Sequence, residues 1–204
     1  LASRDIALRA LASLRDTGYN NSMQAGHRLR CYPTDAQAKI LLQWIGCQRF
    51  IYNAKVGEDR YFRAFARKSL ALAGQFAPID QQYSHFKTDL TPWLRDVPSQ
   101  VLRNGAVLWK QAYSRFFQKL GGRPVIHGKQ GQQSVWLTSE LFAFEAITDP
   151  VTGTTLSWKL RLGTARFPVG ALAFKAHRKV RKLDLDRPPA SLHISVHAGR
   201  WHVS

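Results

Sequence analysis

The hydrophobic pattern of this chain changes its period once, and the change separates a helical part from a part made of strands. Up to Gly121 and Gly122, apolar residues recur at the three- and four-residue spacing of amphipathic helices. After Pro124 they alternate with polar residues, which is the pattern of half-buried strands. Four strands are predicted there: 141–147, 156–163, 192–196 and one that begins at Trp201.

A short basic strand, within residues 26–33, comes before the first predicted helix. Thr34 and Gln37 have the spacing of a capping box, so a helix is expected to begin directly after Thr34. Gly46 is expected to interrupt this helix, because glycine is a poor helix former. The helical pattern then resumes and continues to about Lys68.

Two more helices are predicted before the strands. The first spans residues 79–90. The second is expected to have its cap at Asp96 and Pro98 in its first turn, and to end at Gly121 and Gly122. Its apolar stripe is formed by Val101, Leu108, Ala112 and Phe116.

These elements predict an α+β protein, in which a small antiparallel β-barrel has its first strand separated from the others by an inserted helical domain. The expected parts are a helical N-terminal extension (1–25), the first strand (26–33), the helical domain (34–122) and the remaining strands (123–204). The sequence stops within the strand that begins at Trp201, so we expect the chain to be a portion of a longer protein.

The charge of the chain indicates a polyanionic partner. Thirty Lys and Arg residues oppose thirteen Asp and Glu, which gives a net charge of +17. Nucleic acid is favoured over a membrane surface, because no apolar run approaches the roughly 20 residues needed to span a bilayer and no lipidation signal is present. Cys31 and Cys47 are interpreted as ordinary thiols in a reducing cytoplasm rather than as a disulfide or a zinc site.

The sequence contains no complete active site by our reading. It lacks the GxSxG, Walker, HExxH and GxGxxG motifs. His193 and His197 lie on one strand face but about 13 Å apart, too far to share a metal ion. A two-metal nuclease needs several convergent carboxylates, and the only close acidic pair late in the chain, Asp184 and Asp186, lies among basic residues. We therefore predict no catalytic residue, metal or cofactor in this chain.

Two groups of residues are candidates for nucleic-acid contacts. The run 175–182, KAHRKVRK, suits phosphate contacts, although a solvated basic loop has the same composition. Ser99, Gln100 and Arg103 lie at a helix start, and Gln and Arg can make paired hydrogen bonds to base edges. An ordinary amphipathic helix looks the same. The predicted phosphate or RNA contacts are Arg28, Arg30, Arg49, Lys175, Arg178, Lys179, Arg181 and Lys182.

Five segments occur in the order seen in one protein family: YPTDAQ, GCQRFIYN, WLRDVPSQVLRNG, AYSRFFQKLGGRP and SVWLTSE. By these segments the chain resembles the TnpB family of insertion-sequence-encoded, RNA-guided DNA endonucleases, which are related to type V CRISPR effectors. The resemblance covers Gly26 to the end. It implies an oligonucleotide-binding-like wedge barrel with an inserted helical recognition domain. It also implies a guide RNA from the transposon end (omega RNA) and double-stranded target DNA as partners.

The resemblance also assigns site residues. Ser99, Gln100 and Arg103 match the helix start that reads a short target-adjacent DNA motif, and Thr138 and Ser139 match a loop that touches the same DNA. Arg103 stands where glutamine is frequent. The segment usually reading PRFK is PVIH here, from Pro124 onward.

The resemblance further implies a RuvC-like nuclease region, with acidic residues that bind magnesium, in the same or a separate chain. This chain would then be the nucleic-acid-recognition half of a metal-dependent endonuclease in a bacterial cytoplasm. Two alternatives remain open: a stand-alone RNA- or DNA-binding module or repressor, and a transposase that binds DNA without RNA.

Overall fold

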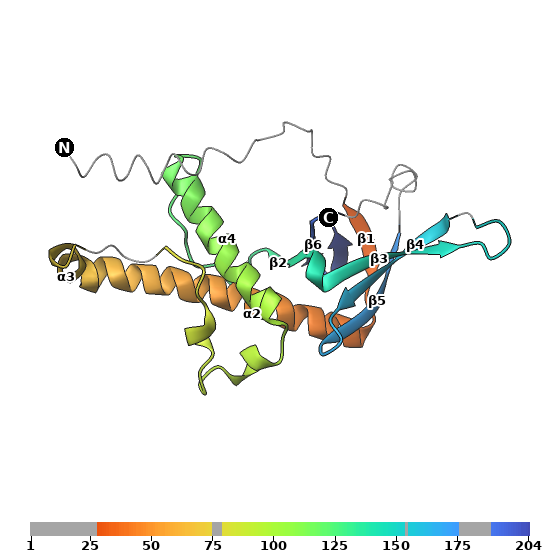
Figure 1. The fold of residues 1–204 in the computed structure, drawn as a ribbon, viewed down its shortest axis with the longest axis horizontal. Helices are drawn as coiled ribbons and strands as arrows, with labels where there is room; N and C mark the ends of the chain where they lie inside the picture. Colours follow the sequence, from red (N-terminus) through yellow and green to blue (C-terminus); the bar gives the residue numbers. More distant parts are fainter. Residues whose placement is uncertain (1–27, 75–78, 154, 176–188) are drawn as a thin grey trace.

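The computed structural model describes residues 28–74, 79–153, 155–175 and 189–204, and it has an α+β architecture (Figure 1). Two long helices lie beside a twisted antiparallel sheet. The helices are α2 (Asp35–Tyr61), α3 (Arg67–Leu72) and α4 (Ser99–Phe117), with a π-helical segment (Phe62–Ala66) between α2 and α3. The strands are β1 (Leu29–Tyr32), β2 (Gln133–Thr138), β3 (Phe142–Thr148), β4 (Thr155–Gly163), β5 (Pro168–Lys175), β6 (Ser191–His197) and β7 (Arg200–Val203).

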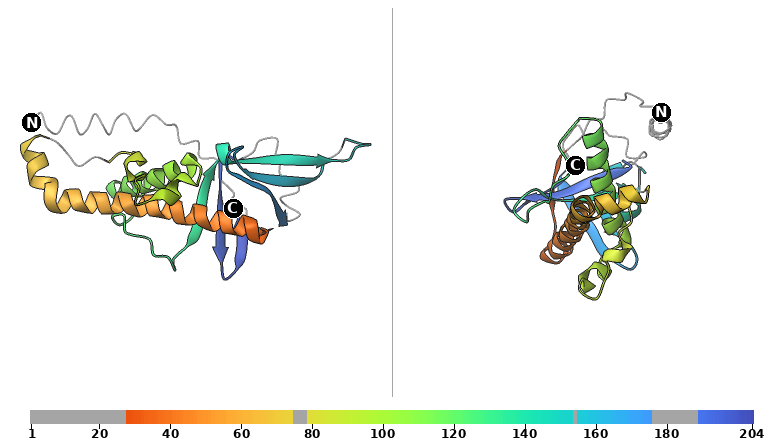
Figure 2. Two further views of the ribbon diagram at one scale, coloured as in Figure 1. Left: turned by 90° about the horizontal axis from the view of Figure 1, so that it is seen from below. Right: turned by 90° about the vertical axis from the view of Figure 1, so that its left-hand side faces the viewer.

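The α+β class predicted from the sequence is confirmed, but the sheet is not a closed barrel. Its strand order is β2-β6-β7-β1-β5-β4-β3, so β2 and β3 are the two edges in the described part of the chain. Only a short 3₁₀ turn, Ser139–Leu141, joins these two edges. The β3–β4 hairpin extends away from the other strands (Figure 2). β3 is therefore carried away from β2 and cannot pair with it.

The strands predicted from alternation are confirmed as β3, β4, β6 and β7, and the basic strand as β1. Strands β2 and β5 were not predicted. β1 lies between β7 and β5, far from its sequence neighbours, as expected when helices are inserted after the first strand.

The prediction that Gly46 interrupts the first helix was wrong, because α2 is continuous from Asp35 to Tyr61. The predicted capping box is confirmed: the Gln37 amide donates to the Thr34 hydroxyl, and the Gln37 side chain accepts from the Thr34 amide. Residues on both sides of Gly46 are buried, including Trp44, Ile45, Cys47 and Ile51. Their packing outweighs the cost of one glycine, about 1 kcal/mol.

The helix predicted at 79–90 was also wrong; this segment is irregular apart from a 3₁₀ turn, Ser84–Phe86. Side chains there bond to the backbone and compete with helical hydrogen bonds. Asp80 accepts from the Gln82 amide at 3.0 Å, and Thr91 accepts from the Thr88 amide at 3.0 Å.

The predicted limits of α4 need small corrections. Asp96 does not cap the helix, because α4 begins at Ser99 with Pro98 as its N-cap residue. The helix ends at Phe117, before the two glycines. Lys119, with φ of 60°, takes the left-handed position expected of a glycine.

Helices α2 and α4 and one face of the sheet share one apolar core. A second buried cluster lies between the two helices and consists of Tyr52, Val56, Trp109 and Tyr113. The two helices come into close backbone contact at Gly105. A Cβ atom at this position would lie 2.6 Å from the Gln48 carbonyl oxygen and 3.1 Å from the Ile51 Cβ. Only glycine lets the two backbones come so near each other.

Both cysteines are free thiols, as predicted, and the structure shows that both are buried. Burial raises the pKa of Cys31 and of Cys47 to about 11, so both are protonated and unreactive at neutral pH. No helix in the described ranges combines the length and the apolar character needed to cross a membrane. The predicted helical extension (1–25) lies outside the described residues.

Two glycine substitutions should have opposite effects on stability. Gly46→Ala should raise the free energy of unfolding by roughly 0.5–1 kcal/mol, because a Cβ at this helical position meets open space. Gly105→Ala should lower it by about 1–3 kcal/mol, because its Cβ meets the Gln48 carbonyl. Urea denaturation measures both. Equal effects of the two substitutions would contradict the helix packing described above.

Candidate nucleic-acid interface

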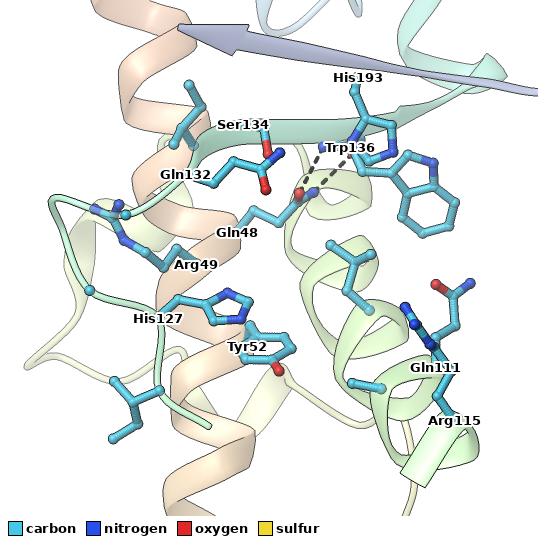
Figure 3. A pocket seen from close by; sticks show the side chains of 16 residues that line it. Gln48, Arg49, Tyr52, Gln111, Arg115, His127, Gln132, Ser134, Trp136 and His193 are labelled. Carbon is cyan, nitrogen blue, oxygen red and sulfur yellow. Dashed lines mark hydrogen bonds between the residues drawn. The ribbon is translucent and has the colours of Figure 1, made fainter. Parts of the chain in front are cut away.

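The side-chain amide of Gln48 fixes the position of α2 against the edge of the sheet. It accepts from the Trp136 amide at 2.8 Å and donates to the Trp136 carbonyl at 2.9 Å, as a neighbouring strand would (Figure 3). It also donates to the Val101 carbonyl of α4 at 3.2 Å. Gln48 is 3% exposed, so these bonds form away from water. Asn104 adds a second bond to the Trp136 carbonyl, at 3.1 Å.

One turn further along α2, Asn53 holds the segment that leads into β2. Its side chain donates to the His127 carbonyl at 3.0 Å and accepts from the His127 amide at 2.8 Å. The rings of Tyr52 and His127 stack with centroids 4.1 Å apart. Arg49 donates to the Gln133 side chain at 2.9 Å. The motif GCQRFIYN thus fastens α2 to residues 126–136.

A cleft of about 630 Å³ lies between α2, α4, β2, β6 and the segment before β2. Arg49, a predicted phosphate contact, lines it together with Arg115, His127 and His193. Burial and the nearby Arg49 lower the pKa of His127, and burial lowers the pKa of His193. Both imidazoles are therefore neutral at neutral pH.

The outer face of the sheet is basic. Arg30 on β1 lies directly opposite Lys175 on β5 and His202 on β7, so the three side chains share one face. Arg28 and Arg200 precede two of these residues by two positions and lie on the same face. We call Arg28, Arg30, Lys175, Arg200 and His202 the basic sheet face. Strands β1, β5, β6 and β7 contain no Asp or Glu.

Part of the basic sheet face is hollowed. Arg28, His197, Arg200 and His202 line a shallow depression of about 550 Å³. The Arg28 guanidinium lies 3.3 Å from Nδ1 of His202 and donates to it. Burial, Arg28 and Arg30 lower the pKa of His202. The predicted contacts Arg28, Arg30 and Lys175 are thus brought together, whereas Arg178, Lys179, Arg181 and Lys182 lie outside the described residues.

Two of the residues assigned to DNA-motif reading, Arg103 and Thr138, lie within contact of each other. Arg103 on α4 places Nη2 3.5 Å from the Thr138 hydroxyl at the end of β2. Ser99 and Ser139 are exposed, and Gln100 is half-buried beside Ser99. These residues surround the start of α4 and the turn after β2.

Glu140, beside Arg103, was not predicted from the sequence as a residue of this site. It forms an ion pair with Arg103 at 2.5 Å, between partners 37 residues apart in the chain. Neither residue is buried, so the pair is open to exchange with another anion. No spacing rule links the two positions. Glu140 is, however, the sole acidic residue of the segment SVWLTSE, which the sequence does display.

In the described ranges, no three His, Cys, Asp or Glu side chains gather closely enough to hold a metal ion. The predicted magnesium binding concerned a nuclease region that this sequence does not include.

A family model described as a helix-turn-helix domain, HTH_OrfB_IS605, matches residues 23–56. The match supports similarity to the N-terminal region of IS605 OrfB/TnpB-type transposases, and it indicates a DNA-binding, transposon-associated protein. From residue 28 to 56 the structure has β1 followed by one uninterrupted helix, without a turn between two helices. No curated protein matches the chain.

Replacing Gln48 with methionine tests the amide that joins α2 to the sheet. Gln48→Met keeps the length of the side chain but leaves the Trp136 amide without its partner, so the free energy of unfolding should fall by about 1–3 kcal/mol. Gln43→Met, on the exposed side of α2, is the control and should have little effect. Urea denaturation separates the two. Equal stability of both variants would show that the amide contributes nothing.

Proposed function

We propose that this chain is the wedge and recognition portion of a TnpB-like, RNA-guided DNA endonuclease. The basic sheet face binds the phosphates of a guide RNA. The start of α4 and the end of β2 contact a short target-adjacent motif in duplex DNA. Base pairing between guide and target then supplies the sequence choice, as in other RNA-guided nucleases.

One observation carries this proposal. Arg103 and Thr138 were assigned to the same DNA contact from separate sequence segments, and the fold brings them within 3.5 Å of each other. Each lies at the end of an element, Arg103 in the first turns of α4 and Thr138 as the last residue of β2. Because elements of the shared core hold both, their side chains present one surface to a ligand.

Arg103 is held in place before DNA arrives. Glu140 keeps its guanidinium beside Thr138, and a guanine edge offers two acceptors to the same donors. DNA therefore has to replace a carboxylate that Arg103 already contacts. A poorly matched base, which offers fewer acceptors, replaces it less well than a correctly placed guanine. Glu140 thereby increases the discrimination between matched and mismatched bases.

The basic sheet face provides the sequence-independent part of binding. Strands β1, β5, β6 and β7 carry no carboxylate, so the positive charges of Arg28, Arg30, Lys175 and Arg200 on this face are available to phosphates. Contacts of this kind position a nucleic acid without reading its sequence. This is the role expected toward a folded guide.

The helix-turn-helix description of the matching family favours a second candidate, a transposase that binds DNA directly and without RNA. The nucleic acid that copurifies with the protein discriminates between the two. A defined RNA bearing the transposon-end sequence excludes the direct DNA binder. Stable, sequence-specific duplex binding by RNA-free protein excludes the guided mechanism.

Arg103→Ala should abolish the preference for duplexes that carry the target-adjacent motif while leaving RNA affinity unchanged. Losing a paired contact to one base costs about 1–3 kcal/mol of discrimination. Glu140→Gln should instead tighten binding to duplexes without the motif, because Arg103 is no longer held. Electrophoretic mobility shifts with motif-bearing and scrambled duplexes measure both effects.

Arg161→Ala is the matched control for Arg103→Ala, since Arg161 also forms an exposed ion pair, with Glu145 at 2.9 Å on the β3–β4 hairpin. It should leave motif discrimination intact. A parallel loss of RNA binding in Arg103→Ala would show that the α4 start has another role.

Removing three charges from the basic sheet face should weaken RNA binding and its salt dependence together. For the triple variant Arg28→Ala, Arg30→Ala and Lys175→Ala, the slope of log affinity against log salt should fall by about 2, at roughly 0.7 per lost contact with single-stranded phosphate. Fluorescence anisotropy over a salt series measures it. The control removes three exposed charges from the far end of the helices: Arg60→Ala, Arg67→Ala and Lys68→Ala. Equal losses in both variants would mean that net charge alone binds RNA.

A further inference from the structure

The cleft beside Gln48 has rigid walls. The side chains of Gln48 and Asn53 are both engaged with backbone groups of the segment that leads into β2 and of β2 itself. Arg49 is bonded to Gln133, and Tyr52 is stacked on His127. These residues hold the cleft open at about 630 Å³, within the range of small-ligand pockets.

The opposite wall, on α4, has free donors. Gln111 and Arg115 are four residues apart, so they lie on the same side of the helix, and both line the cleft (Figure 3). Gln132 lines it from the segment before β2. Within the described part of the chain, these three side chains make no hydrogen bond or ion pair. A ligand can therefore use them without breaking existing contacts.

The cleft is suited to an anion that carries an aromatic ring. Arg49 and Arg115 supply positive charge, and none of the described residues that line the cleft is acidic. Ring surfaces are provided by the exposed His127, which stacks on the buried Tyr52, and by Trp136 (Figure 3). Free amide groups of glutamine pair with base edges, and aromatic rings stack on bases. The cleft therefore offers arginines to a phosphate, glutamine amides to a base edge and aromatic rings to a base face.

The cleft is continuous with the basic sheet face. Along β6, alternate residues share one face, so His193, Ser195 and His197 lie on the same side of the sheet. His193 lines the cleft, and His197 lines the depression formed with Arg28, Arg200 and His202. About 13 Å of strand connects the two. A nucleic acid strand bound on the basic sheet face thus reaches the cleft without leaving the polar surface.

We propose that this cleft binds one unpaired nucleotide, with its phosphate at Arg49 and Arg115 and its base against Gln111, Gln132 and the aromatic rings. The nucleotide belongs to the strand held by the basic sheet face. The inference rests on the proposed nucleic-acid binding but not on the guided mechanism. RNA and DNA offer the same phosphate and base, so the test includes both.

The test uses hairpins with and without a one-nucleotide bulge, the bulge being 2-aminopurine, whose fluorescence falls on stacking. The complete chain should bind the bulged hairpin about tenfold more tightly than the fully paired one, with loss of fluorescence. RNA and DNA versions identify which nucleic acid supplies the nucleotide, and a preference for either bulge supports the proposal. Equal affinity for bulged and paired hairpins of both kinds would overturn it.

Paired substitutions locate the bulge contact. The double variant Gln111→Ala and Arg115→Ala should remove the bulge preference and restore the 2-aminopurine fluorescence. Its affinity for paired hairpins should stay within about twofold of that of the unmodified protein, because the phosphate contacts on the basic sheet face remain. Lys110→Ala, on α4 but not lining the cleft, is the control for loss of one charge and should keep the preference. A bulge preference that survives the double substitution would place the contact elsewhere. The bulge preference is independent of the target-adjacent motif. If Arg103→Ala kept full motif discrimination, the proposed motif contact would be wrong, but the bulge preference would still support nucleotide binding in the cleft.

Discussion

The arrangement of helices and sheet depends on one buried side chain, Gln48. Its amide acts as a short piece of strand at the edge of β2, and it reaches α4 as well. Because an unpaired buried amide is costly, this geometry tolerates little displacement. Gly105 sets the second constraint, since it admits the Gln48 backbone at contact distance. The amide and the glycine together determine where the start of α4 lies relative to the end of β2.

In the described part of the chain, the acidic residues that form ion pairs neutralise cations outside the basic sheet face. Lys55 is 1% exposed and contacts Glu58 and Asp80, which ties the irregular segment after residue 79 to α2. Burial would raise the pKa of Asp80, but hydrogen bonds from Lys55 and the Gln82 amide lower it overall. Among residues 28–74, 79–153, 155–175 and 189–204, the acidic residues in ion pairs are Glu58, Asp59, Asp80, Asp89, Glu140 and Glu145.

Local patterns predicted the elements whose burial follows a simple period. Alternation identified β3, β4, β6 and β7, and the capping box gave the start of α2. Strand β5 was not predicted, because Gly170, with φ of 87°, interrupts its alternation of apolar and polar residues. The Gln37 side chain donates to the carbonyls of the residues on both sides of that glycine. The Arg103–Glu140 ion pair and the clefts could not be predicted from the sequence, for a different reason. They join residues far apart in sequence, and no spacing rule reports such contacts.

The motif GCQRFIYN is one of the five segments that carry the family resemblance, and the structure gives it a mainly internal use. Gln48, Arg49, Tyr52 and Asn53 all contact other parts of the protein. A resemblance carried by such residues indicates a common fold more directly than a common ligand. The side chains left free for a ligand, Gln111, Arg115 and Gln132, lie on the facing surfaces. In the nucleotide binding proposed above, the base would be read by these free side chains, which the motif positions, while Arg49 of the motif would supply positive charge to the phosphate.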